Sequence, residues 1–163
     1  HHDRAIDDRA ATAIFEQDLL PFVTGLLAGA RAVMMAHVEY PAIAADAAGY
    51  SRYWIKDVLR GALGFTGIVI SDDIGMVAGA ALGDVSARLA AHRDAGCDLI
   101  LVCDPALVPD ALEAARPLHL RATAHLADRL RGRLRASLRR AREGSTWSQR
   151  AARLDALLEL APP

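Results

Sequence analysis

Two adjacent carboxylates, Asp72 and Asp73, follow a short apolar run at residues 67–71. A continuous run rich in β-branched residues predicts a buried strand, and α/β folds place their active sites at the carboxyl ends of such strands. Neighbouring carboxylates repel each other and are costly to bury, so fold stability alone gives little reason for the pair. Adjacent side chains of an extended segment point to opposite sides. We therefore expect Asp72 to face a reaction site, with helix capping as the alternative, and Asp73 to hold structure.

A histidine, His37, closes another apolar run at residues 32–38. If both runs are parallel strands, His37 lies at the same edge of the sheet as Asp72. It is then either a substrate contact or a buried histidine that holds the site together. At the start of the chain, His1, His2 and Asp3 have suggestive spacing, but a terminal histidine pair is also typical of an expression tag.

Several other kinds of chemistry are not indicated. The sequence has no glycine-rich phosphate loop, no Gly-x-Ser-x-Gly elbow and no metal-ligand spacing, so we expect neither a metal nor an organic cofactor. Cys97 and Cys103 form no disulfide framework and no zinc pattern. Reduced cysteines are typical of a cytosolic protein, and we expect a cytoplasmic location.

These residues need elements to position them, and the chain alternates helical patterns with apolar runs. Ser51 is a candidate cap for a helix that ends at Gly64, and Gly96 closes another helix. Apolar strands separated by helices predict a parallel sheet covered on both faces. The predicted helices are 14–27, 53–63, 85–95 and one beginning after Pro105, and the predicted strands are 32–38, 67–71 and 98–103.

The chain has 163 residues, which suffices for a single domain over 1–163. A closed eight-stranded barrel needs about 250 residues. The three strand–helix units therefore predict either part of a barrel or a small doubly wound sheet. A net charge of -1 gives no electrostatic case for nucleic acid or an anionic membrane. No apolar run approaches the roughly 20 residues that span a bilayer.

The C-terminal region, residues 117–163, has a helical pattern of its own. Leucines recur every four residues over 126–138 with arginines between them, which predicts an amphipathic helix packed on its leucine stripe. Contact with nucleic acid or a membrane is the alternative. Trp147 and the leucines of 154–160 predict a last helix that docks back on the body.

Three segments resemble family 3 glycoside hydrolases of the bacterial β-N-acetylhexosaminidase type. Residues 31–40 read RAVMMAHVEY and are similar to that family's Met-Pro-Ala-His-Val strand. Residues 51–76, which read SRYWIKDVLRGALGFTGIVISDDIGM, resemble its long motif with Leu-Gly-Phe-x-Gly and Ser-Asp-Asp-Leu-x-Met. Residues 95–103, AGCDLILVC, resemble its last barrel strand. The resemblance runs from residue 1 to about 115 and implies an α/β fold: the C-terminal portion of a (β/α)8 TIM barrel, about three βα units plus C-terminal helices.

The resemblance also implies roles for residues. The first aspartate of the Ser-Asp-Asp element, here Asp72, is the family's nucleophile. The family's acid/base histidine precedes an arginine by eight residues, as His1 precedes Arg9, so residues 1–10 are the catalytic-loop remnant. Ala5 stands where the family usually has proline. Substrate-pocket positions are His37, Asp73 and Met76.

The implied activity is retaining hydrolysis of terminal β-1,4-linked N-acetylglucosamine from anhydro-muropeptides in cell-wall recycling. The N-terminal half of the barrel, which holds most of the family's sugar-binding residues, is not in this sequence and is an expected partner. Three alternatives stay open: another family 3 β-glycosidase, a non-catalytic half-barrel, and a phospho-receiver module whose aspartate pair takes a phosphoryl group. An isolated half-barrel should expose strand edges and an apolar face.

Overall fold

The computed structural model describes residues 4–76 and 82–118, together with 128, 130, 144, 145, 147–149 and 151–153. The chain divides into two compact units, His1–Leu130 and Arg131–Pro163. In the second unit, the described residues 147–149 and 151–153 are helical. The leucine stripe, apart from Leu130, and the predicted helix at 154–160 lie outside the described residues. The expectation of one domain over 1–163 stays a prediction.

Three parallel strands form the centre of the first unit, in the order β2-β4-β5. They are β2 (Ala32–Met35), β4 (Ile68–Asp73) and β5 (Leu99–Leu101). Ala32 pairs with Ile68 and Met35 with Ser71, so β2 and β4 end almost level. The existence of the three predicted strands and their parallel pairing are confirmed, with bounds that differ from the predicted ones by up to three residues. The carboxyl ends of these strands meet at one edge of the sheet.

A second, two-stranded sheet was not expected. The strand β1 (Ala5–Ile6) pairs in parallel with β3 (Val38–Glu39). The predicted strand 32–38 is therefore interrupted after Met35, and its last part belongs to a different pairing. This pairing fixes residues 5–6 beside the segment that directly follows His37.

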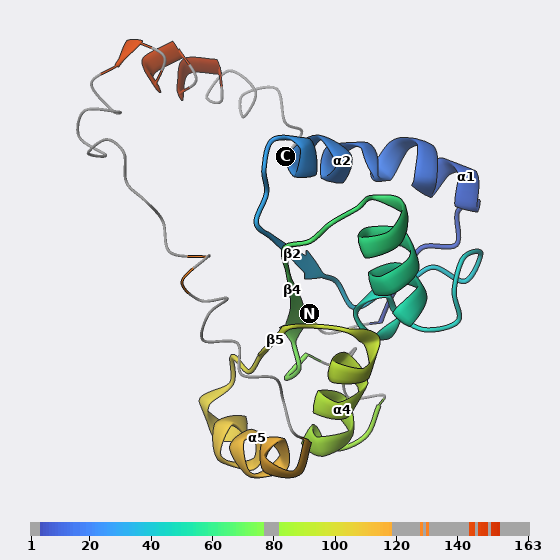
Figure 1. Ribbon diagram of the computed structural model, residues 1–163, viewed down its shortest axis with the longest axis vertical. Coiled ribbons are helices and arrows are strands. Elements are labelled where there is room, and N and C mark those ends of the chain that lie inside the picture. The colour runs from blue at the N-terminus through green and yellow to red at the C-terminus, as the bar shows by residue number, and fades with distance from the viewer. Residues whose placement is uncertain are drawn as a thin grey trace, which may run out of the picture. The chain divides into compact units, whose positions relative to one another are not determined.

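Helices of the first unit pack beside the three strands (Figure 1). None of those in the described part of the chain is long and apolar enough to cross a membrane. The bounds of the helices are α1 (Ala11–Ala13), η1 (Ile14–Asp18), α2 (Leu20–Leu27), η2 (Ala48–Tyr50), η3 (Tyr53–Ala62), α4 (Val85–Ala95), η4 (Pro105–Leu107), α5 (Val108–Ala115) and η5 (Arg116–Leu118). Predicted helix 14–27 is observed as two pieces, η1 and α2, directly preceded by the short α1. Predicted helix 53–63 is observed as one π-type helix that ends before Gly64.

Helix α4 has well-defined ends, as its sequence predicts. At its start the Asp84 carboxylate accepts a hydrogen bond of 2.8 Å from the Ala87 backbone N–H. At its end Gly96 has a φ of 114°, a left-handed conformation that glycine adopts without the steric cost that a Cβ brings. The two caps fix the length of the helix and thereby the place of His92, three residues before its C-terminal residue.

The core lies between the strands and the helices. Its main cluster joins Ile14, Trp54 and Ile55 of the helices to Met35 and Val69 of the strands. A smaller cluster of Ile74, Leu89 and Ala111 lies between the end of β4 and helices α4 and α5. Burial of this apolar surface, at roughly 25 cal/mol per Å², is the main stabilising contribution.

On the opposite face of β2, the described part of the chain leaves Met34 largely uncovered. Met34 is 51% exposed while its neighbour Met35 is 8% exposed, because successive side chains of a strand point to opposite faces. The expectation of a sheet covered on both faces is therefore wrong at Met34. The exposure of Met34 agrees with the expectation that a partial barrel exposes apolar surface.

Candidate active site

The candidate site begins at an irregularity in β4. Ile70 pairs with Leu99 and Asp73 pairs with Leu101, so β4 advances three residues where β5 advances two. The buried Ser71 completes the pairing: its hydroxyl accepts a 2.9 Å hydrogen bond from the Leu101 backbone N–H. The same hydroxyl donates to the carbonyl of Asp72 at 2.6 Å. Bulges of this kind redirect side chains and are common beside active sites.

Asp73 holds the backbone around the end of β4. Its Oδ1 accepts hydrogen bonds from the backbone N–H groups of Cys103, at 2.8 Å, and Gly75, at 3.1 Å. These bonds tie the turn after β4 to the segment after β5. These contacts agree with the structural role that the sequence predicts for Asp73. Its place in a substrate pocket stays a prediction.

Asp72 is bound differently. Its Oδ1 accepts a 2.9 Å hydrogen bond from the backbone N–H of Asp73, which orients the carboxylate. Within the described part of the chain, Oδ2 has no hydrogen-bond partner, and the side chain is half-buried. A carboxylate with one oriented oxygen and one available oxygen can attack an electrophile or accept a proton.

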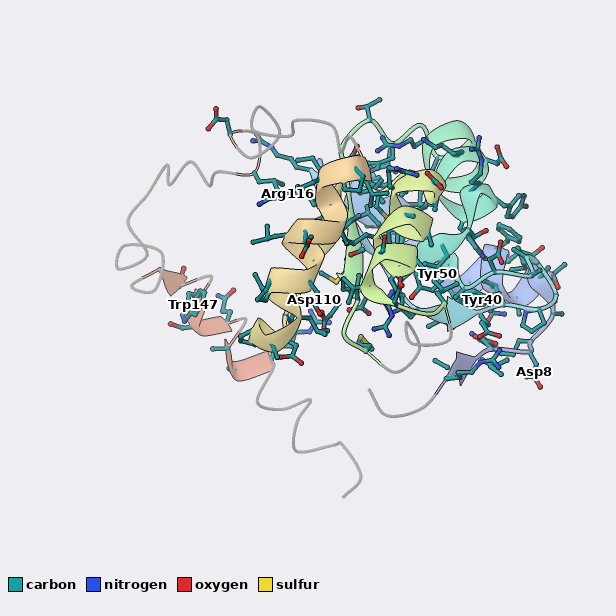
Figure 2. All side chains as sticks on the ribbon, turned by 90° about the horizontal axis from the view of Figure 1, so that it is seen from below. Asp8, Tyr40, Tyr50, Asp110, Arg116 and Trp147 are labelled. Carbon is teal, nitrogen blue, oxygen red and sulfur yellow. The ribbon has the colours of Figure 1, made fainter. Side chains whose placement is uncertain are left out.

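Three aromatic rings lie together near Asp72. His37 stacks on Tyr50, with ring centroids 4.9 Å apart, and Tyr50 contacts His92 at 4.5 Å. The two histidines approach through their Nε2 atoms, which are 3.2 Å apart. His92 Nδ1 lies 2.9 Å from the carbonyl oxygen of Gly49. In Figure 2 the labelled Tyr50 lies against helix α4, which carries His92.

Burial keeps both histidines neutral. It lowers the pKa of His92 from 6.5 to about 4, with a further lowering from His37, while the Gly49 carbonyl and the charge of Asp72 act in the opposite direction. Burial also lowers the pKa of His37, and the charges of Asp72 and then Asp73 oppose this. The carboxylates are therefore close enough to influence both rings. Burial raises the pKa of Tyr50 to about 12, so its hydroxyl stays protonated.

Other predicted site residues are placed less completely. Met76 is half-buried one turn after Asp73, to whose carbonyl its N–H donates at 3.2 Å. His37 is only 4% exposed, so a direct substrate contact stays a prediction. His1 lies outside the described residues. Arg9, which shares the motif with His1, pairs with Asp7 at 2.6 Å and also with Asp18.

The candidate site is an open strand end. A cavity of about 530 Å³ lies elsewhere, between β5, α4 and α5, and is lined mainly by apolar side chains with Lys56, Arg93 and Asp98. Neither Asp72 nor Asp73 lines this cavity. Because these carboxylates are the residues suited to catalysis, the candidate active site is at the strand end. Among the described residues, no group of three or more His, Cys, Asp or Glu side chains is arranged to hold a metal ion.

Sequence reasoning missed His92 and Tyr50. A signal existed for His92: it is three residues after Leu89 and three before Ala95, and both of these are buried on the inner face of α4. A histidine at helical spacing between apolar core residues points inward. For Tyr50 no comparable pattern exists, because it lies in a short turn at the end of a loop.

Comparisons with known proteins bear on the whole arrangement. Residues 1–131 match the family described as glycosyl hydrolase family 3 N terminal domain. A β-hexosaminidase of Stenotrophomonas maltophilia (strain R551-3) is 53% identical over 150 residues, which cover 91% of this chain and 45% of that protein. The chain thus spans less than half the length of this curated relative.

Solved structures give the same picture. NagZ from Neisseria gonorrhoeae in complex with N-trifluoroacetyl-D-glucosamine is 35% identical with a TM-score of 0.65, covering 79% of this chain and 37% of that one. The β-N-acetylglucosaminidase from Thermotoga maritima is 33% identical with a TM-score of 0.64, covering 72% of this chain and 27% of that one. These similarities confirm the predicted fold class, an α/β chain that corresponds to part of a barrel.

Proposed function

Because the chain belongs to glycosyl hydrolase family 3, we propose that it carries the nucleophile, Asp72, of a retaining β-N-acetylglucosaminidase. The observation that supports this most is the contrast at the end of β4. Asp73 is engaged by two backbone N–H groups, whereas Asp72 has one oriented oxygen and one without a partner in the described part of the chain. The relatives and solved neighbours named β-hexosaminidase, NagZ and β-N-acetylglucosaminidase support the choice of sugar.

In the proposed mechanism, the Asp72 carboxylate attacks the anomeric carbon as the bond to the leaving oxygen breaks. The product of this step is a glycosyl ester of Asp72, which water then hydrolyses with overall retention of configuration. The bulge at Ser71 contributes by turning the carboxylate off the regular strand, and Asp73 contributes by fixing the turn behind it.

A retaining enzyme also needs an acid to protonate the leaving oxygen and a base to activate water. We assign both tasks to His1, because a histidine titrates near neutral pH. Arg9 lies eight residues after His1, and Asp7 lies six residues after it. The two side chains form an ion pair, which anchors the segment that follows His1. His37, Asp73 and Met76 are proposed to surround the sugar from the sides of β2 and β4.

The proposed substrate is terminal β-1,4-linked N-acetylglucosamine on anhydro-muropeptides, consumed in the cytoplasm during cell-wall recycling. The relatives are more than twice as long as the matched region, so the remaining strands of a barrel would supply most of the contacts to the sugar. A β-hexosaminidase barrel completed by a complementary N-terminal part is therefore the proposed active form.

The test is labelling with a fluorinated N-acetylglucosamine derivative that forms a slowly hydrolysed glycosyl-enzyme, followed by peptide mass spectrometry. The chain is incubated alone and together with the N-terminal half of the Stenotrophomonas β-hexosaminidase. We expect an adduct on the peptide that carries Asp72, and its loss in Asp72→Asn. Asp104→Asn is the matched control, because asparagine can keep the cap that Asp104 makes with the Ala106 N–H.

An adduct on a different carboxylate would overturn the assignment of Asp72. Absence of any adduct, with a circular dichroism spectrum that shows a folded complex, would favour the non-catalytic half-barrel. Labelling by a fluoroglucose reagent in place of the N-acetylglucosamine reagent would instead favour another family 3 β-glycosidase.

A further inference from the structure

The buried contact between His37 and His92 has only one neutral arrangement of protons. The carbonyl of Gly49 can only accept, so the Nδ1 of His92, 2.9 Å away, must carry a hydrogen. A neutral imidazole has one N–H, and the Nε2 of His92 is therefore a bare acceptor. At 3.2 Å it must receive the Nε2–H of His37, because two bare nitrogens would repel each other.

The remaining ring nitrogen whose protonation must be assigned is the Nδ1 of His37. A neutral His37 whose Nε2 carries the hydrogen has an unprotonated Nδ1, and this atom is buried with no hydrogen-bond partner among the described residues. His37 consequently has no N–H to offer to a carboxylate. A neutral His37 in this tautomer is not a hydrogen-bond donor to Asp72.

We propose that His92 is a positioning residue: by accepting the Nε2–H of His37, it holds neutral His37 in the Nε2–H tautomer, so that no N–H of this ring is directed at Asp72. The effect of this tautomer on catalysis by Asp72 rests on the proposed function. The tautomer itself does not depend on the proposed function. In the other tautomer, an N–H of His37 directed at Asp72 would hydrogen-bond the carboxylate and occupy a lone pair needed for attack.

The packing around the pair supports a fixed geometry. His92 is 0% exposed, and its ring touches Tyr50. A Cβ on Gly49 would lie 3.1 Å from Cδ2 of His37 and 3.3 Å from Cε1 of His92, so this glycine allows the rings to approach the loop backbone. Cys97, whose Sγ is 3.8 Å from His92 Nδ1, has a pKa raised by burial to about 12 and stays an uncharged thiol.

The charged and titratable groups that face His37 come from three elements. Asp72 and Asp73 of β4 favour its protonation, whereas Tyr50 of η2 is neutral and stacks on the ring. His92 of α4 supplies the acceptor. Without this acceptor, Asp72 and Asp73 are the charged groups of the described residues that bias the ring, and they favour a tautomer with an N–H directed at them.

The experiment is nitrogen-15 NMR of the histidine side chains in the full chain, with His37 assigned by comparison with His37→Asn. We expect the spectrum at pH 7 to show His37 with a protonated Nε2 and an unprotonated Nδ1. In His92→Phe, which keeps the ring but has no acceptor, we expect a mixture of the two neutral tautomers. In His92→Gln, whose amide oxygen can accept the same hydrogen, we expect the wild-type tautomer to return.

The second readout is the pH dependence of kcat/KM for an aryl N-acetylglucosaminide, measured on the complex described above. At the pH optimum His92→Phe should lower kcat/KM by about tenfold, because a carboxylate that accepts an N–H from His37 is a weaker nucleophile, and His92→Gln should restore it. A wild-type His37 with a protonated Nδ1, or an unchanged His37 spectrum in His92→Phe, would overturn the proposal. If His92→Phe does not fold, His92→Leu, which also lacks the acceptor and fills the buried position with an apolar side chain, takes its place in both measurements.

The two readouts separate this inference from the proposed function. If the complex hydrolyses no N-acetylglucosaminide but the tautomers are as expected, the proposed function fails while the assignment of His92 stands. If hydrolysis occurs and the tautomers differ, the inference fails alone.

Discussion

At the scale of single residues, the two neighbouring aspartates are distinguished by what their oxygens accept. Asp73 receives N–H groups from two different segments, whereas within the described part of the chain Asp72 receives the N–H of its own neighbour alone. The first arrangement resists displacement, because moving the carboxylate would leave two backbone donors without acceptors. The second leaves a carboxylate oxygen available for chemistry.

The buried His92 makes the stability of the fold depend on pH. Its pKa is lowered from 6.5 to about 4 by burial and by His37, so the native state stays unprotonated where the unfolded state already binds a proton. The stabilisation is therefore present above pH 6.5 and is lost as the pH falls from 6.5 toward 4. In this window we expect the free energy of unfolding to fall more steeply in the wild type than in His92→Gln, by a slope that approaches about 1.4 kcal/mol per pH unit.

Urea unfolding at half-unit pH steps, followed by circular dichroism, measures this slope. The carboxylates titrate in both proteins, so the difference between them isolates the histidine. Parallel curves for the two proteins between pH 6.5 and 4 would show that His92 is not held neutral.

At the scale of elements, the bulge in β4 links the strand pairing to the site. Ser71 replaces a backbone carbonyl as acceptor for the Leu101 N–H, so one side chain maintains the sheet where the register shifts. The Ser-Asp-Asp sequence thus combines a structural hydroxyl, an available carboxylate and a bracing carboxylate in three consecutive residues. Each of the three has a different set of partners.

Replacing Ser71 by alanine should destabilise this end of the sheet. The Leu101 N–H would lose its acceptor, and the expected loss in the free energy of unfolding is about 1–3 kcal/mol. Ser51→Ala is the matched control, since Ser51 is also buried but its contact with the Trp54 N–H is 3.5 Å long. Hydrogen exchange of the Leu101 amide should accelerate in Ser71→Ala and stay unchanged in Ser51→Ala; equal protection in both variants would contradict the bridging role.

At the scale of the whole first unit, the uncovered face of β2 matters most. This strand is at the edge of the three-stranded sheet, and Met34 is exposed on it. Exposed apolar side chains on an edge strand favour association with another surface. In the proposed active form that surface is the rest of the barrel.

The neighbouring methionines offer a direct test. We expect the chain to self-associate in a concentration-dependent manner, and Met34→Thr to reduce this association without loss of stability, because threonine suits a strand and is polar. Met35→Thr should instead lower the free energy of unfolding by about 2–4 kcal/mol, because Met35 packs in the core. Light scattering after size-exclusion chromatography and urea unfolding measure the two effects; association that is unaffected in Met34→Thr would exclude this face.

The sequence by itself determined the presence of β2, β4 and β5, the end of helix α4 and the position of the carboxylates. Apolar runs and capping residues act locally, so β4, helix α4 with its end at Gly96, and Asp72 at the strand end could all be located from neighbouring residues. Family resemblance, which depends on the same local motifs, predicted the fold class. By contrast, His1 and the leucine stripe, apart from Leu130, lie outside the described residues, and the roles assigned to them stay predictions.

Only the tertiary structure decided which side chains meet. His37 and His92 are 55 residues apart in sequence, and their contact depends on the packing of α4 against the loop that ends in Tyr50. The pairing of β1 with β3 and the register shift between β4 and β5 are likewise long-range features. No local pattern encodes such contacts, because each depends on how whole elements pack, and the protonation of His37 follows from that packing.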